Sequence, residues 1–209
     1  MIAALLLGAL ATGRAAEPRP LLDAARLTDW EYVTPGQTAS LAGVCTVEAD
    51  GSLRFAGKPT GFVATKAVHG DYRLHVEWRW TDKPGNGGVL LHITTGPKDR
   101  AWPESFQVQT KHHSAGDLLP MAGATFAEPI TSPAGAAAAR GHAAADSERP
   151  AGEWNRADIV CRGGEITVTI NGVEQNHVTG CSARAGRIGL QFEGTPFAVR
   201  AVQIEPLAP

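Results

Sequence analysis

The sequence predicts an all-β protein built as an antiparallel sandwich or barrel, and three observations support this fold class. Many short segments alternate apolar and polar residues, turns rich in Gly, Asn, Asp and Pro separate them, and no helical crossovers lie between them. In such a sheet, each strand has one face toward the core and one face away from it. Polar residues that alternate with core residues therefore become candidates for a functional surface.

Residues 72–80 (YRLHVEWRW) carry the clearest strand pattern, with strict alternation over the whole segment. One face would hold the apolar residues Tyr72, Leu74, Val76, Trp78 and Trp80, and the other would hold Arg73, His75, Glu77 and Arg79. The same pattern predicts strands over residues 89–94, 106–111, 157–161, 165–170, 187–193 and 199–204.

Two dipeptides, Asp50-Gly51 and Asn171-Gly172, have the chemistry of tight hairpin turns. Residues 127–152 are different, because they are rich in Ala, Pro and Gly and lack apolar periodicity. We expect a long exposed loop there, with one helical turn at residues 136–140.

Composition limits the range of functions. A chain of 209 residues that is 43% hydrophobic can form one domain with a sizeable core. A net charge of −2, without a cluster of Lys and Arg, argues against nucleic acid as a partner. No segment after the N-terminus is apolar for long enough to cross a membrane. The composition does not set the oligomeric state.

The N-terminal residues 1–15 resemble a secretory signal peptide. The apolar run at residues 2–11 is too short to span a bilayer, and the small residues Gly13 and Ala15 would suit cleavage after Ala15. The segment has no Lys or Arg ahead of its apolar run, so a misassigned start codon or a lipid-facing anchor remain alternatives. A signal peptide would place the mature protein in the periplasm or outside the cell.

Three widely spaced cysteines show no C-x-x-C spacing, so neither a zinc site nor a thioredoxin motif is indicated. In an oxidising compartment Cys161 and Cys181 could form a disulfide. Buried or half-buried free thiols on strands, with Cys45 among them, are the other interpretation.

Strand alternation gathers several polar residues on non-core faces. These are His75 and Glu77, His92, the set Gln107, Gln109 and Lys111, and the pair Gln191 and Glu193. One face that carried all of them would suit a hydroxylated ligand. The simpler interpretation is a sheet face that meets water. Glutamine at alternate positions is not a favoured strand residue, which favours a role for Gln107 and Gln109.

The adjacent His112 and His113 cannot both bind one metal if they lie on a strand, because neighbouring side chains point to opposite faces. We expect a solvated turn there. The run GNGGV at residues 85–89 would allow a tight turn or close approach of a ligand, which makes Asn86 a candidate binding residue. A divalent metal held by Glu77, His92, Gln109 and Glu193 is conceivable as a cofactor, although no specific ion is indicated.

Seven segments of the chain, taken in order, resemble the 3-keto-disaccharide hydrolase domain family, a branch of the concanavalin-like lectin/glucanase jelly rolls. The resemblance covers residues 22–206, and its segments are LLDAARLTDWEY, VEADGSLRFAGKPTGFVATK, GDYRLHVEWRW, GNGGVLLH, WPESFQVQTKHHSAGD, GEWNRADIVCRGGEITVTINGV and GRIGLQFEGTPFAVRAVQIEPL.

The resemblance implies a two-sheet antiparallel jelly roll whose concave face binds an oligosaccharide or glycoside oxidised to a ketone at C3. That ketone acidifies the proton at C2, so a base can remove it, the group at C1 can depart, and water can add to the resulting enone. A carbohydrate-binding jelly roll without catalysis is the alternative, followed by a structural or interaction module.

The resemblance also assigns roles residue by residue. Glu77 matches an acidic position of the family, and His92 stands where the family often has Arg. Gln107 occupies a position that is frequently Glu, Gln109 matches a family glutamine, and Asp117 matches the acid of an A-G-D turn. Glu193 stands where many relatives carry His. The expected catalytic residues are therefore Glu77, His92 and Glu193, and the expected substrate-binding residues are Asn86, Gln107, Gln109, Lys111 and Asp117.

Overall fold

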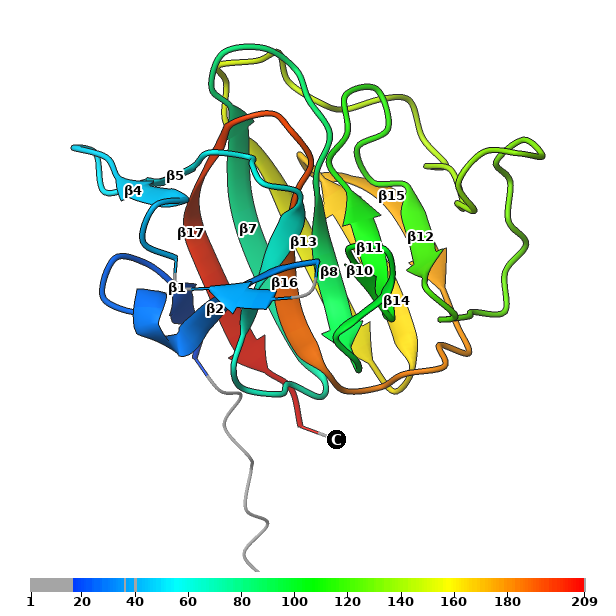
Figure 1. The fold of residues 1–209 in the computed structure, drawn as a ribbon. Coiled ribbons are helices and arrows are strands. Elements are labelled where there is room, and N and C mark those ends of the chain that lie inside the picture. Colours follow the sequence, from blue (N-terminus) through cyan, green and yellow to red (C-terminus); the bar gives the residue numbers. More distant parts are fainter. Residues whose placement is uncertain (1–16, 36, 40, 209) are drawn as a thin grey trace, which may run out of the picture.

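The computed structural model describes residues 17–35, 37–39 and 41–208, so the signal peptide expected at residues 1–15 lies outside the described residues. Two antiparallel sheets pack face to face and form a sandwich (Figure 1). This confirms the predicted all-β, two-sheet fold. Among the described residues no helix is long and apolar enough to cross a membrane.

The first sheet, called sheet A, has β7 near its centre. Its order is β15 (Val173–Val178), β14 (Glu165–Ile170), β13 (Asn155–Arg162), β7 (Tyr72–Trp80), β17 (Phe197–Pro206), β5 (Leu53–Phe55) and β4 (Cys45–Val47), with β1 (Arg19–Leu22) also pairing with β17. Strand β7 coincides with the predicted segment 72–80.

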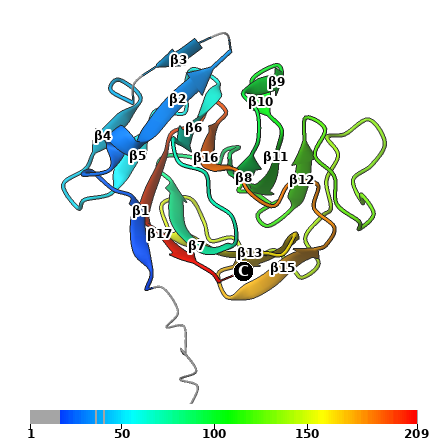
Figure 2. The same cartoon turned by 90° about the horizontal axis from the view of Figure 1, so that it is seen from below.

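The second sheet, called sheet B, has the order β12 (Leu118–Met121), β11 (Ser105–Gln109), β8 (Gly88–Ile93), β16 (Arg187–Phe192), β6 (Gly61–Thr65), β2 (Trp30–Thr34) and β3 (Gln37–Ala39). A small hairpin of β9 (Pro97–Asp99) and β10 (Trp102–Pro103) lies between β8 and β11 in the chain. Figure 2 shows this hairpin on the side of sheet B that faces away from sheet A. A short 3-10 helix, η1 (Leu27–Asp29), precedes β2.

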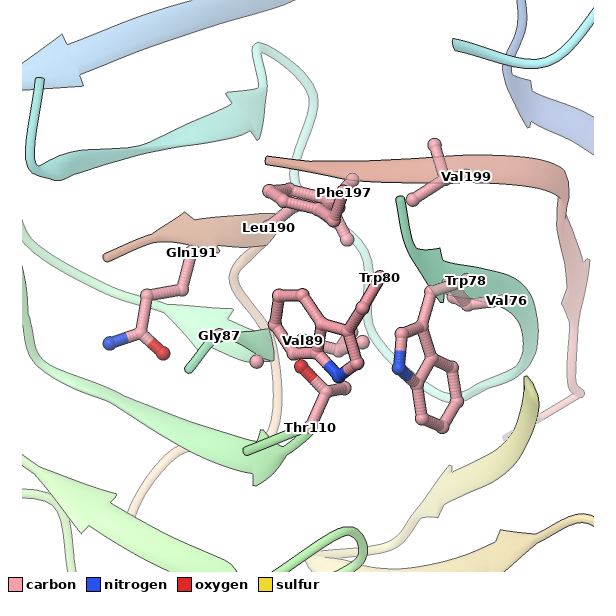
Figure 3. A pocket seen from close by; sticks show the side chains of 11 residues that line it. Val76, Trp78, Trp80, Gly87, Val89, Thr110, Leu190, Gln191, Phe197 and Val199 are labelled. Atoms are coloured by element: carbon pink, nitrogen blue, oxygen red, sulfur yellow. The ribbon is translucent and has the colours of Figure 1, made fainter. Parts of the chain in front are cut away.

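The core lies between the sheets, where the inward residues of both interdigitate. Phe192 of sheet B meets Phe55 of sheet A edge-to-face, with ring centroids 5.3 Å apart. Figure 3 shows a small apolar pocket in this core, with Trp78, Trp80 and Phe197 on one side and residues of β8 and β16 on the other. Thr110 and Gln191 also line this pocket, but its other lining residues are glycines and apolar or aromatic residues of the packed core, so it does not have the polar lining expected of a sugar site.

The centre of sheet B is buried on both faces. Every residue of β8 and β11 is buried. On the face away from sheet A, a second apolar cluster contains Val33, Phe62, Ala64, Leu90 and Ile93. We call this surface the outer face of sheet B.

Both predicted hairpin turns are confirmed. Asn171 and Gly172 have positive φ values of 51° and 87° and join β14 to β15, while Gly51, with φ of 80°, lies in the turn between β4 and β5.

Residues 122–154 form a long connection without a helix or strand. The helical turn expected at residues 136–140 is not formed. Instead Ala136 N–H donates to Pro133 O, and Arg140 exchanges backbone hydrogen bonds with Leu118 at the edge of sheet B. Pairing with that sheet edge draws the segment into an extended conformation.

The cysteines Cys45, Cys161 and Cys181 are free, so the disulfide considered for Cys161 and Cys181 is not formed. Cys161 lies fully buried on β13, and burial raises the pKa of its thiol to about 12. It therefore packs as a small apolar side chain.

Candidate functional site

A row of three glutamine side chains lies on the outer face of sheet B. Gln109 of β11 pairs with Gly88 of β8. Leu190 of β16 pairs with Val89, so the same register sets Gln191 beside Gly88 on the other side. Gln107, Gln109 and Gln191, called the amide row below, are all at least nine-tenths buried.

The amide row is hydrogen-bonded from end to end. Gln107 Nε2 donates to Gln109 Oε1 at 2.7 Å and to Gln191 Oε1 at 2.6 Å. Gln191 Nε2 then donates to Glu193 Oε2 at 2.8 Å. The row therefore ends on a carboxylate at the end of β16.

Gly88 makes these contacts possible. A Cβ atom at Gly88 would lie 2.7 Å from both Cγ and Nε2 of Gln107, so only glycine leaves room for this amide to cross from β11 toward β16. The sequence predicts a tight turn or a close approach of a ligand for the glycines of this segment. Gly88 instead accommodates a neighbouring side chain.

Charged residues surround the open end of the row. Partial burial raises the pKa of Glu193, and the positive charges of Lys111 and Arg100 partly oppose this shift. The backbone bonds Thr110 N–H to Gly87 O and His112 N–H to Gly85 O continue the β8–β11 pairing, which sets Lys111 opposite Asn86. Asn86 is half-buried, and its Oδ1 is one of the buried oxygens without a hydrogen-bond partner in the described chain.

Asp117 lies beside Gln109, since Gln109 N–H donates to Asp117 O at 2.9 Å. Its carboxylate is held by His142 of the long connection, at 2.8 Å from the backbone N and 2.6 Å from Nδ1. Asp117 is therefore at the edge of the outer face, where it anchors a loop.

The adjacent histidines are in a turn, as predicted, but they also hold the same connection. Glu148, with a side chain only 2% exposed, is 2.8 Å from His112 Nδ1 and accepts a 3.0 Å bond from His113 N–H. Trp80 Nε1 donates to the other carboxylate oxygen of Glu148, Oε1, at 3.2 Å. The sequence does not single out Glu148, because its segment has no periodicity that marks a buried residue.

The profile of the 3-keto-alpha-glucoside-1,2-lyase-like domain matches residues 17–205, nearly the whole described chain. The chain belongs to this family. The membership confirms the resemblance found in the sequence and makes the protein a relative of 3-keto-glycoside lyases. A search of curated proteins found no match.

Solved structures of similar fold include two candidate glycosyl hydrolases from Parabacteroides distasonis. One is 22% identical with a TM-score of 0.66 and covers 91% of this chain and 100% of its own. The other is 17% identical with a TM-score of 0.62 and covers 87% and 89%. A carbohydrate-binding module from Bacillus subtilis is 13% identical, with a TM-score of 0.58 and coverage of 85% and 95%. At these identities the likeness shows a shared fold.

Glu77, the first catalytic candidate by family resemblance, does not share a face with the amide row. It lies on β7 of sheet A, between β13 and β17, and is 2.5 Å from Arg200 Nε. The expectation of one shared face is wrong here because alternation shows that a residue faces away from the core, but not on which sheet.

The expectation from strand alternation that His92 lies on a non-core face is also wrong. Two residues of β8, Leu91 and His92, lie opposite one of β16, and His92 has a φ of 49°, which together form a β-bulge. The bulge turns the imidazole into the core. Its ring centroid lies 5.5 Å from that of Tyr72, and its Nδ1 lies 3.2 Å from Ala183 O. Burial lowers the pKa of His92.

The metal site expected from Glu77, His92, Gln109 and Glu193 is not assembled. Glu77 lies on sheet A, His92 is buried in the core, and Glu193 follows β16 at the outer face of sheet B. Across residues 17–35, 37–39 and 41–208, no cluster of three or more His, Cys, Asp or Glu side chains could hold a metal ion.

Proposed function

We propose that this protein cleaves glycosides carrying a ketone at C3, and that the reaction takes place at the outer face of sheet B with Glu193 as the base. The observation that carries this proposal is the position of Glu193, held by an amide at one oxygen with Lys111 and Arg100 within electrostatic reach. Family membership supports the substrate class.

The arrangement fits each step of an elimination. Glu193 takes the proton from C2, and the C–H electrons form an enolate with the C3 ketone. Lys111 and Arg100 stabilise the negative charge on the enolate oxygen. The electrons then form the C1–C2 double bond as the C1–O bond breaks, and the departing oxygen receives the proton from Glu193. Addition of water across the double bond completes net hydrolysis.

The raised pKa of Glu193 suits this role, since a base works best when its pKa lies near the working pH. The base acts only when ionised. Activity should therefore fall as the pH drops through the pKa of Glu193, and this limb should lie above the usual range of a glutamate.

The test is incubation of the purified protein with a 3-keto-disaccharide, with enone absorbance and released monosaccharide as readouts. Glu193→Gln should lower kcat/KM by about 10²–10⁴-fold, the typical contribution of a general base. Glu77→Gln is the matched control and should keep activity, because Glu77 lies on the other sheet. No turnover by the native protein, or full turnover by Glu193→Gln, would refute the proposal.

A second candidate function is carbohydrate binding without catalysis. The polar groups at the open end of the row favour it, because Asn86, Lys111 and Glu193 offer donors and acceptors to hydroxyl groups and binding alone requires no base. This function would give sugar-dependent thermal stabilisation that survives Glu193→Gln, and no turnover of any 3-keto-glycoside. We further propose a periplasmic or secreted location, which the sequence pattern of residues 1–15 supports.

A further inference from the structure

The amide row has a direction. Each glutamine amide has a donor end and an acceptor end, whereas an ionised carboxylate accepts only. Glu193 therefore requires the N–H end of Gln191, and this fixes the Gln191 oxygen toward Gln107. Gln107 must in turn present its nitrogen, whose two hydrogens are taken by Gln191 and Gln109.

We propose that Gln191 is the positioning residue of Glu193, and that Gln107 and Gln109 act through it by fixing which end of its amide meets the carboxylate. The consequence for catalysis rests on the proposed function. The direction of the row rests on hydrogen bonding alone.

Burial makes this orientation collective. Gln107 and Gln191 are 2% and 3% exposed, so water cannot replace a lost partner at either amide. If Gln191 turned over alone, its oxygen would meet the Glu193 carboxylate and its nitrogen would meet the Gln107 nitrogen. Both contacts would be repulsive, so one amide cannot turn without the others.

The direction also leaves one acceptor unused. With its nitrogen committed to two glutamines, Gln107 keeps a buried Oε1 that has no hydrogen-bond partner within the described chain. An amide free to turn would not retain such an orphan oxygen, because a buried acceptor without a donor is costly. The two short bonds made by Gln107 Nε2 outweigh that cost.

For Glu193 the result is a fixed carboxylate. The N–H group of Gln191 engages Oε2 and favours the ionised form, so Oε1 is the oxygen that would take the C2 proton. The other groups with an electrostatic influence on this carboxylate are Lys111, which follows β11, and Arg100 of the β9–β10 hairpin.

A stability test needs no substrate. Gln107→Glu keeps the shape of the side chain but replaces the amide nitrogen, which donates two hydrogen bonds, by a carboxylate oxygen, which can only accept. It should therefore lower the melting temperature. Adding Glu193→Gln moves the carboxylate to the other end of the row. Gln191 can then turn over, donate to the carboxylate introduced at position 107 and accept from the amide introduced at position 193. The double variant should melt well above Gln107→Glu alone.

The control for adding a carboxylate is Gln203→Glu, an exposed position on sheet A, whose effect Glu193→Gln should not relieve. If Glu193→Gln fails to raise the melting temperature of Gln107→Glu, the amide row has no fixed direction and the proposal is overturned.

A second test measures the Glu193 carboxyl directly, by ¹³C NMR titration assigned through its loss in Glu193→Gln. Gln191→Met removes the donor and keeps most of the volume. It should raise the pKa of Glu193 by about one pH unit, the shift expected for one hydrogen bond to a charged group. An unchanged pKa would overturn the proposal.

With substrate, the acid limb of kcat/KM should move upward by the same amount in Gln191→Met. Lower activity without such movement would mean that Gln191 is structural only. If the native protein shows no turnover while both substrate-free tests succeed, the amide row stands and only the proposed function fails.

Discussion

Gly88 shows how a missing side chain can organise a polar site. Its backbone lies between Gln109 and Gln191, and the amide of Gln107 occupies the space where a Cβ atom would be. The backbone there has no left-handed φ, so the need for glycine comes from packing against Gln107. The geometry of the amide row therefore depends on a residue that has no side chain and makes none of the hydrogen bonds of the row.

Gly88→Ala should lower the free energy of unfolding by about 1–3 kcal/mol, as is usual when an extra methyl group is forced into a packed region. The displaced Gln107 would also lose its two short bonds. Denaturant unfolding measures the effect. Gly96→Ala is the control, because a Cβ atom there meets nothing within 4 Å, and it should change stability by less than about 0.5 kcal/mol.

At the scale of elements, strand β8 marks the limit of prediction from alternation. The sequence predicts a strand over residues 89–94 and β8 confirms it, but the bulge at His92 reverses the pattern after Leu91. His92 turns to the core, and Ile93 joins Leu90 on the outer face. A bulge depends on the pairing with β16, so the local sequence does not reveal it.

The long connection at residues 122–154 is held by buried charge. Glu148 receives three hydrogen bonds, from Trp80, His112 and His113, with its side chain almost fully buried. Glu148→Gln should destabilise the protein by about 1–3 kcal/mol, because an amide nitrogen would face donors.

Limited proteolysis should show faster cleavage within residues 127–147 in Glu148→Gln. Glu153→Gln, at an exposed position of the same connection, should be cleaved at the native rate. Equal cleavage of the two variants would mean that Glu148 does not hold the connection.

At the scale of the whole molecule, the candidate site is predictable from the sequence only in part. Alternation correctly predicts one shared face for Gln107, Gln109 and Gln191, because it holds along β11 and β16 and both strands belong to sheet B. The same reasoning is wrong for Glu77. The chain passes from β7 in sheet A directly to β8 in sheet B, and long-range pairing alone decides that change.

The sequence also does not predict Arg100 as a residue of the candidate site, for a different reason. It lies in the short β9–β10 hairpin, whose exposed residues carry no alternation, and its influence on Glu193 arises from the folding of that hairpin beside sheet B. Loops that reach over a sheet contribute to sites through tertiary structure.

Double-sided burial should make the centre of sheet B the most protected part of the protein. Backbone amides of β8 and β16 should be among the last to exchange with deuterium, whereas those of the exposed edge strand β4 should exchange early. Hydrogen–deuterium exchange with mass spectrometry tests this. Early exchange of β8 would mean that the outer face opens without global unfolding.

The direction of the amide row also has a consequence for the history of the family. A carboxylate at either end satisfies the row, but with one at each end the oxygen of the central amide would have to face a carboxylate whichever way it turned. Substitutions at Gln107 and Glu193, which are joined only through Gln191, therefore constrain each other. Across relatives these two positions should covary: an acidic residue at one of them should be accompanied by a non-acidic residue at the other.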